Sequence, residues 1–178
     1  DKTSAVFSQD DIAFLNEVGE TILPATATPG AKAANVGEFM TVMVNDCYTE
    51  NDQKTFHEGM AKLNSASKKK FNASFMKLTP EQRHDLLVEL DKESKDYQKK
   101  KSDFDSEQNK KEAEEKAKGN TGYKKEEMPS HYFRMMKELT MLGYFTSKIG
   151  CTEARRYVAV PGKFEGCIPY KKGDKAFA

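Results

Sequence analysis

The segment 91–127 restricts the fold of this chain more than any other part of its sequence. It contains eleven lysines and eleven aspartates or glutamates, and it has no Leu, Ile, Val or Met. A segment of this composition buries too little apolar surface to offset the conformational entropy that it loses on ordering. We therefore expect residues 91–127 to be a charged, partly mobile insertion, helical around 106–118 through pairs of opposite charge. The hydrophobic core must then come from the sequence on either side.

The flanking sequence carries helix signals and almost none of the alternation that is typical of strands. Ser8 matches a helix N-cap, and so does Thr79, which has Gln82 three residues further on. Apolar residues recur at helical spacing over 12–22, 36–48, 51–65, 86–90 and 131–145, and a further short helix is expected over 152–159. We therefore predict a single all-α domain over 1–178, with five to six helices in a compact arrangement. It ends in an irregular, extended arm, residues 148–178.

The overall composition argues against two classes of protein. Among the 178 residues, 29 are Lys or Arg and 28 are Asp or Glu, so the net charge is +1. A nucleic-acid-binding protein needs a dense basic face, which this balance does not favour. No run approaches the roughly 20 apolar residues that cross a bilayer, so we expect no transmembrane segment. Cys47, Cys151 and Cys167 lack metal-site spacing and leave two alternatives, one disulfide with a remaining thiol or three thiols.

The motifs that usually carry catalytic chemistry are missing from this sequence. His57 precedes Glu58 but lacks the second histidine of a zinc-binding HExxH motif, and neither His84 nor His131 is spaced to join it. There is no phosphate-binding loop, no dinucleotide fingerprint and no nucleophile elbow. We therefore expect no catalytic residue, metal or cofactor in this chain. The alternative is a free-standing enzyme or small-molecule-binding protein with a pocket built from two pairs, His57 with Glu58 and His84 with Asp85.

Residues 141–170 differ from the helical, lysine-rich sequence that precedes them. They combine aromatic residues and an arginine pair with glycines and prolines. Aromatic residues and arginine are enriched in the cores of protein interfaces. Residue types alone leave two alternatives open: this stretch lies across another protein, or it packs back over the helices of its own chain.

The same stretch resembles the C-terminal signature of the gluconate 2-dehydrogenase subunit 3 family. In that family a helix ending in T-x-x-GYFTS-x-IG is followed by an Arg-Tyr segment and then by PG-x-(F/Y)-x-G-C-x-P. Here the signature runs from Thr140 to Pro169. Two further motifs agree and occur in the right order. The family's ILP-x-T-x-TPGA matches residues 22–31, and its F-x-x-LTPEQR matches residues 75–83.

The resemblance implies a function without chemistry in this chain. Members of the family are non-catalytic small (gamma) subunits of periplasmic dehydrogenases that oxidise sugars, glycosides, polyols or gluconate. The large partner belongs to the glucose-methanol-choline oxidoreductase family and holds the FAD, and a cytochrome c with haem c often completes the complex. The small subunit binds and stabilises the large one and is exported with it through a twin-arginine signal. A chain that starts at Asp1 would then lack that leader.

Under this resemblance, residues 141–170 are expected to bind the large subunit. The residues expected to contact the partner are Tyr144, Phe145, Arg155, Arg156, Tyr157, Pro161, Phe164 and Tyr170. Two features depart from the family pattern. The charged segment 91–127 is longer and richer in lysine, so we expect it to be peripheral. Cys151 stands where a small residue is more usual; a Cys151–Cys167 disulfide would suit an oxidising periplasm and would leave Cys47 as a thiol.

Overall fold

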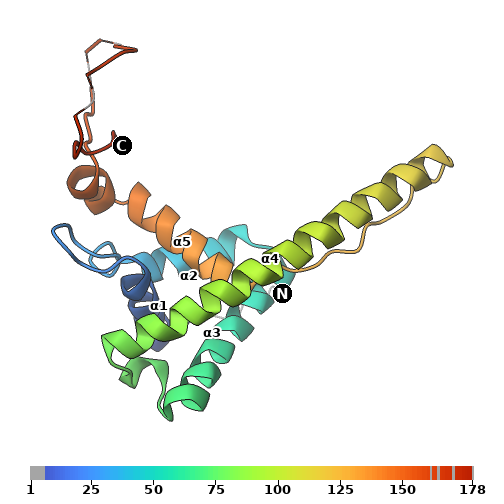
Figure 1. Cartoon of the computed structure of the whole chain (residues 1–178), viewed down its shortest axis with the longest axis horizontal. Coiled ribbons are helices and arrows are strands. Elements are labelled where there is room, and N and C mark those ends of the chain that lie inside the picture. Colours follow the sequence, from blue (N-terminus) through green and yellow to red (C-terminus); the bar gives the residue numbers. More distant parts are fainter. Residues whose placement is uncertain (1–6, 161, 164, 170, 178) are drawn as a thin grey trace. The chain divides into compact units, whose positions relative to one another are not determined.

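The computed structural model describes residues 7–160, 162–163, 165–169 and 171–177 (Figure 1). Its five α-helices are α1 (Gln9–Ile22), α2 (Val36–Cys47), α3 (Glu50–Phe71), α4 (Pro80–Ala117) and α5 (Tyr132–Thr146). A 3₁₀ turn, η1 (Phe75–Lys77), precedes α4, and a π-helical turn, η2 (Gly150–Ala154), follows α5. The described residues contain no strand and a single isolated bridge, so the all-α prediction is confirmed.

Both helix starts predicted from cap residues are confirmed. The backbone N–H of Asp11 donates to the Ser8 hydroxyl at 3.2 Å, and the Asp11 carboxylate accepts from the Ser8 N–H at 2.9 Å. Thr79 and Gln82 form the same reciprocal pair at 3.3 Å and 3.0 Å, with Pro80 in the first turn of α4. Each cap satisfies N–H groups that lack a partner inside the helix, which contributes about 1 kcal/mol to stability.

Two compact units divide the chain. The first combines Asp1–Met43 with Lys137–Ala178, and the second is Val44–Met136. Buried apolar side chains occur in both: Phe14, Leu15, Val18, Val36, Met40 and Leu139 in the first, and Phe56, Leu63, Phe75, Leu86, Leu90 and Phe133 in the second. The assignment of residues 1–178 to one domain stays a prediction. Among the described residues, no helix combines the length and the apolar character needed to cross a bilayer.

Helices of the first unit approach one another closely at two glycines. A Cβ atom at Gly37 of α2 would lie 2.5 Å from the carbonyl oxygen of Ile12 and 2.9 Å from the backbone N of Asn16, both in α1. The Asn16 side-chain oxygen accepts the Gly37 N–H at 2.9 Å, which fixes this crossing. A Cβ atom at Gly143 of α5 would lie 2.6 Å from the Phe39 ring in α2. Only glycine leaves room for these contacts.

The helix α4 is longer than the sequence indicated. We expected helix only around 106–118 within the charged segment, but α4 runs without a break to Ala117. Ion pairs one turn apart line it: Lys95 with Asp91 at 2.7 Å, Lys101 with Asp105 at 3.0 Å and Lys116 with Glu112 at 2.7 Å. Each such pair stabilises an exposed helix by a few tenths of a kcal/mol, and lysine and glutamate are good helix formers.

A returning segment, residues 118–131, lies along α4 and supplies contacts that local sequence does not reveal (Figure 1). The Gln108 side chain is buried, and its oxygen accepts from the Tyr123 hydroxyl and from the Glu126 N–H, both at 3.3 Å. Nearer the base of the helix, the Tyr97 hydroxyl donates to the Pro129 carbonyl at 2.9 Å. The charged segment is therefore an ordered pairing of helix and extended chain in this structure; its partial mobility stays a prediction.

Two smaller expectations need correction. The helix expected over 51–65 extends to Phe71, because Asn72 closes it in the left-handed conformation (φ 55°) and three lysines complement the negative end of its dipole. The helix expected over 152–159 is instead the short turn η2, which ends at Arg155 in an extended conformation. Periodicity left two positions for the buried stripe near the end of α5; Gly143 is buried and Leu142 is exposed.

Candidate docking surface

Residues 143–150, with the sequence GYFTSKIG, form the base of the arm at the end of α5. The Ser147 hydroxyl donates to the Tyr144 carbonyl at 2.7 Å and accepts the Gly150 N–H at 3.0 Å. A Cβ atom at Gly150 would lie 2.8 Å from the Tyr144 carbonyl carbon and closer still to its oxygen. The turn η2 therefore packs directly on the last turn of α5, which only glycine permits at this position.

Arg155 makes three contacts that stabilise this base. Its guanidinium donates to the Phe145 carbonyl, lies 5.6 Å from the centre of the Phe145 ring and is 3.7 Å from the Cys151 sulfur. The Cys151 thiol donates to the same carbonyl at 3.3 Å. Arg155 thus satisfies an α5 carbonyl that has no partner inside the helix and fixes the direction in which the chain continues.

The Tyr144 side chain is hydrogen-bonded to the loop between α1 and α2, which belongs to the same unit. The side chain is only 4% exposed, and its hydroxyl donates to the Pro29 carbonyl at 2.6 Å. The same loop is held from α1 by the Glu20 carboxylate, which accepts the N–H groups of Ala25 and Lys32, each at 2.9 Å. The bond from Tyr144 to Pro29 connects the aromatic motif at the end of α5 with the proline-glycine motif of the loop, although the two are far apart in the sequence.

Beyond Arg155, every described residue up to Phe177 is exposed. The described part of this stretch therefore does not pack back over its own helices, which was one of the two alternatives left by residue types. Val160 is 82% exposed and Tyr157 is 57% exposed. Seven of the ten large apolar side chains exposed in the described chain belong to α5 or to the arm. They are Met141, Leu142, Tyr157, Val158, Val160, Ile168 and Phe177, and we refer to the first six as the docking surface, because the Phe177 ring lies against Arg156.

Such a concentration of exposed apolar side chains is typical of a protein interaction site. The residues predicted to contact a partner fall into three groups. Tyr144, Phe145 and Arg155 form the base of the arm; Arg156 and Tyr157 are exposed; Pro161, Phe164 and Tyr170 lie outside the described residues. Their contact with a partner stays a prediction.

Most of the docking surface was not predicted from the sequence. The buried stripe of α5 that includes Leu139, Thr140, Gly143 and Tyr144 leaves positions 141 and 142 outside. Helical periodicity could have found these two positions. No periodicity marks Val158, Val160 or Ile168, because irregular chain has no face that a pattern can identify.

The three cysteines are unbonded in this structure. Cys47 and Cys167 are exposed, and Cys151 is half-buried against the end of α5. The Cys151–Cys167 disulfide is therefore absent from this structure and stays a prediction for the oxidised protein. Because Cys151 already donates to the Phe145 carbonyl, its position is explained without a disulfide.

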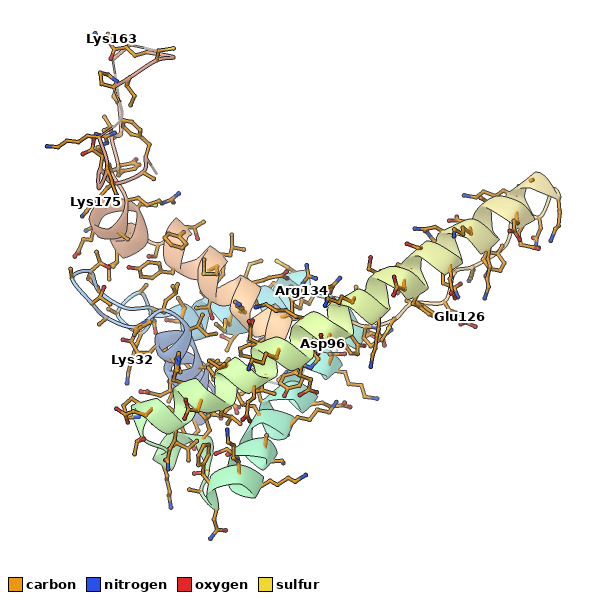
Figure 2. All side chains as sticks on the ribbon, viewed as in Figure 1. Lys32, Asp96, Glu126, Arg134, Lys163 and Lys175 are labelled. Carbon is orange, nitrogen blue, oxygen red and sulfur yellow. The ribbon has the colours of Figure 1, made fainter. Side chains whose placement is uncertain are left out.

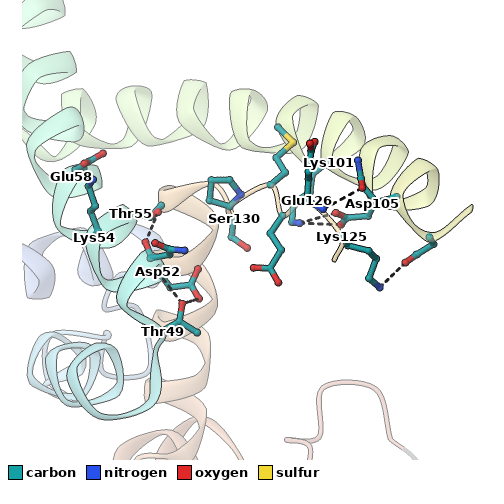
Figure 3. A pocket seen from close by; sticks show the side chains of 16 residues that line it. Thr49, Asp52, Lys54, Thr55, Glu58, Lys101, Asp105, Lys125, Glu126 and Ser130 are labelled. Atoms are coloured by element: carbon teal, nitrogen blue, oxygen red, sulfur yellow. Dashed lines mark hydrogen bonds and ion pairs between the residues drawn. The ribbon is translucent and has the colours of Figure 1, made fainter. Parts of the chain in front are cut away.

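A polar cleft of about 750 Å³ opens in the second unit, where the start of α3 faces the middle of α4 and the returning segment (Figure 3). Its lining includes Glu58 but not His57, His84 or Asp85, and it contains no histidine or cysteine. Within the part of the chain that the structure describes, no three His, Cys, Asp or Glu side chains are arranged to hold a metal ion. The cleft therefore gives no support to the alternative of a pocket built from the two histidine pairs.

Comparison with known proteins identifies one family. A family model described as Gluconate 2-dehydrogenase subunit 3 matches residues 9–162 of the chain. The matched range covers every helix from α1 to α5, the turn η2 and the first part of the arm. No curated protein and no solved structure shows a significant match to the chain. The resemblance drawn from the sequence motifs is confirmed over most of the chain.

Proposed function

Because the chain belongs to the gluconate 2-dehydrogenase subunit 3 family, we propose that it is the non-catalytic small subunit of an FAD-dependent dehydrogenase. The large subunit, of the glucose-methanol-choline oxidoreductase family, holds the FAD and oxidises a sugar, glycoside, polyol or gluconate. A cytochrome c with haem c accepts the electrons in complexes that have a third subunit. The small subunit contributes binding and stability, and its side chains take no part in the chemistry.

The observation that carries the proposal is the docking surface, combined with the family match. Removing apolar side chains from water stabilises a complex by about 25 cal/mol for each Å² buried. Val160 and Tyr157 would gain most, because they are more exposed than the other apolar residues of the surface. The residues that line the cleft of the second unit are charged or polar, apart from Met128 and Pro129, and the cleft takes no part in the proposal.

A binding measurement with matched variants tests the proposal. The full chain is co-expressed with the FAD-bearing large subunit, and complex formation is followed by the flavin absorbance that co-purifies with a tag on the small subunit. Val160→Asp places a carboxylate in the interface and should weaken binding at least tenfold, since burial of a valine side chain contributes about 1.5 kcal/mol or more. Val88→Asp is the control, because Val88 is an exposed valine of α4 in the other unit.

Two results would contradict the proposal. The first is a wild-type chain that never captures the flavoprotein, which would remove the accessory role altogether. The second is equal binding by both aspartate variants, which would place the contact outside the docking surface.

We further propose that the complex is periplasmic and that the two subunits are exported together through a twin-arginine signal. Folded co-export requires that the subunits bind before they cross the membrane. Cell fractionation tests this order of events: the large subunit should remain in the cytoplasm when the small subunit carries Val160→Asp, and reach the periplasm with Val88→Asp. Export of the large subunit in the absence of this chain would contradict it.

A further inference from the structure

The arm returns to its own beginning and closes a loop. The Arg156 N–H donates to the Ala176 carbonyl at 2.8 Å, and Arg156 and Phe177 form the isolated parallel bridge of the structure. The Arg156 guanidinium lies 3.9 Å from the centre of the Phe177 ring. We refer to these contacts of Arg156 with Ala176 and Phe177 as the clasp. Next to it, the Lys175 ammonium donates to the Glu153 carbonyl of η2.

The clasp joins two ends of a segment that has little else to hold it. Every described residue between Arg156 and Phe177 is exposed. Figure 2 shows Lys175 beside η2, at the base of the loop, and Lys163 at its far end. The cation–π contact and the backbone hydrogen bond of the clasp, together with the hydrogen bond from Lys175 to the Glu153 carbonyl, distinguish this loop from an unattached tail.

The loop presents apolar side chains together with positive charge. Between residues 156 and 177 there are five basic residues and two acidic ones, a net charge of +3. Lys163 is paired with Glu165 inside the loop, whereas Lys171 and Lys172 form no ion pair with a described residue. An apolar surface with unpaired lysines fits a protein groove that is apolar along its floor and carries carboxylates along its rim.

We infer that the arm binds the catalytic subunit as a closed loop, and that the clasp holds it in the shape that enters an acid-rimmed apolar groove. This inference rests on the proposed function, because the groove is assigned to the large subunit. The family match ends at residue 162, so it includes Arg156 but not Phe177, and the closed loop is an observation independent of that match.

Closing the loop before binding lowers the entropy that is lost in the complex. For a flexible chain of ~20 residues the free-energy cost of joining the ends is about (3/2)RT ln n, where n is the number of residues, which corresponds to a factor of about 90 in affinity. A single exposed cation–π pair contributes about 0.5–1 kcal/mol, or roughly twofold to fivefold. Arg156 and Phe177 are therefore positioning residues, and each single substitution should weaken binding by about that factor.

The test measures the affinity of full-length variants for the immobilised FAD-bearing large subunit. Arg156→Ala and Phe177→Ala should each weaken binding twofold to fivefold. Lys70→Ala is the matched control, because it removes the cation of another cation–π pair, 5.1 Å from the Phe71 ring in the second unit. Its affinity should equal that of the wild type.

A disulfide variant separates loop closure from the loss of side chains. Arg156→Cys with Phe177→Cys, in a background where the three native cysteines are serine, replaces the clasp by a covalent bond. Bridge partners lie about 5 Å apart, which is within the range of Cα separations that a disulfide spans. The oxidised variant should bind at least as tightly as the wild type, and reduction should weaken it threefold or more.

The outcomes distinguish the two claims. If the wild-type chain does not bind, the proposed function and the closed loop fall together. The second case is that the wild type binds, that Arg156→Ala and Phe177→Ala bind equally well, and that the disulfide variant has the same affinity before and after reduction. The inference that the arm binds as a closed loop is then wrong, and the accessory role stands.

Discussion

Tyr144→Phe tests whether this aromatic residue holds the fold or the partner. The substitution removes one hydroxyl from a buried ring and leaves the Pro29 carbonyl without its 2.6 Å hydrogen bond. Losing this half-buried hydrogen bond costs about 1–2 kcal/mol. For a chain of this size each kcal/mol lowers the melting temperature by roughly 2–4 °C, so we expect a decrease of about 2–8 °C. The assay is thermal unfolding followed by circular dichroism.

Tyr157→Phe is the matched control, because it deletes the same hydroxyl from a ring that is 57% exposed. Its melting temperature should equal that of the wild type. The affinity of Tyr144→Phe for the large subunit should stay within about threefold, since the hydroxyl faces the chain's own loop. A variant with unchanged melting temperature and reduced affinity would refute this reasoning and favour Tyr144 as a partner contact.

Two further predictions concern the base of the arm and the start of α5. Gly150→Ala should lower stability by about 2 kcal/mol, because its Cβ would overlap the Tyr144 carbonyl. Urea unfolding measures this, and Gly122→Ala, whose Cβ would make only an ordinary contact of 3.8 Å with the Asn120 side chain, should have no effect. Burial lowers the pKa of His131, although the nearby Glu93 carboxylate acts to raise it. The Nδ1 atom of His131 accepts the Phe133 N–H at 3.3 Å, so this atom must be unprotonated. Stability should therefore fall as the pH drops below the ordinary histidine pKa of about 6.5, and should level off once the pH is below the pKa of His131 in the folded protein. Urea titrations at several pH values measure this decline, and His131→Asn should reduce it.

The parts of the fold that could be predicted from sequence are those determined by neighbours along the chain. Ser8 and Thr79 cap their helices through residues three positions away, so a short motif was sufficient to place both. The full length of α4 could not be read in this way. Its distal half has no apolar face, and part of its order comes from the returning segment, through contacts such as that between Gln108 and Glu126.

The region of the candidate site stays a prediction, and the structure shows what several of its residues contact within the chain. Aromatic and arginine residues drew attention to 141–170, yet Tyr144 and Arg155 serve the chain's own base, as their bonds to Pro29 and Phe145 show. The clasp between Arg156 and Phe177 escaped notice because it joins two positions in irregular chain, and no spacing rule connects them. Residue type alone does not distinguish an aromatic side chain that packs within its chain from one that faces outward.

Hydrogen exchange of the small subunit, alone and with the FAD-bearing large subunit, tests the central claim most directly. Amides of the described residues between 156 and 177 lie in exposed chain and should exchange within seconds in the isolated subunit, apart from those of Arg156 and Asp174, which donate to the Ala176 and Lys171 carbonyls. In the complex, this segment and the exposed face of α5 around Leu142 should be strongly protected. Protection confined to the second unit, or unchanged exchange throughout 156–177, would contradict it.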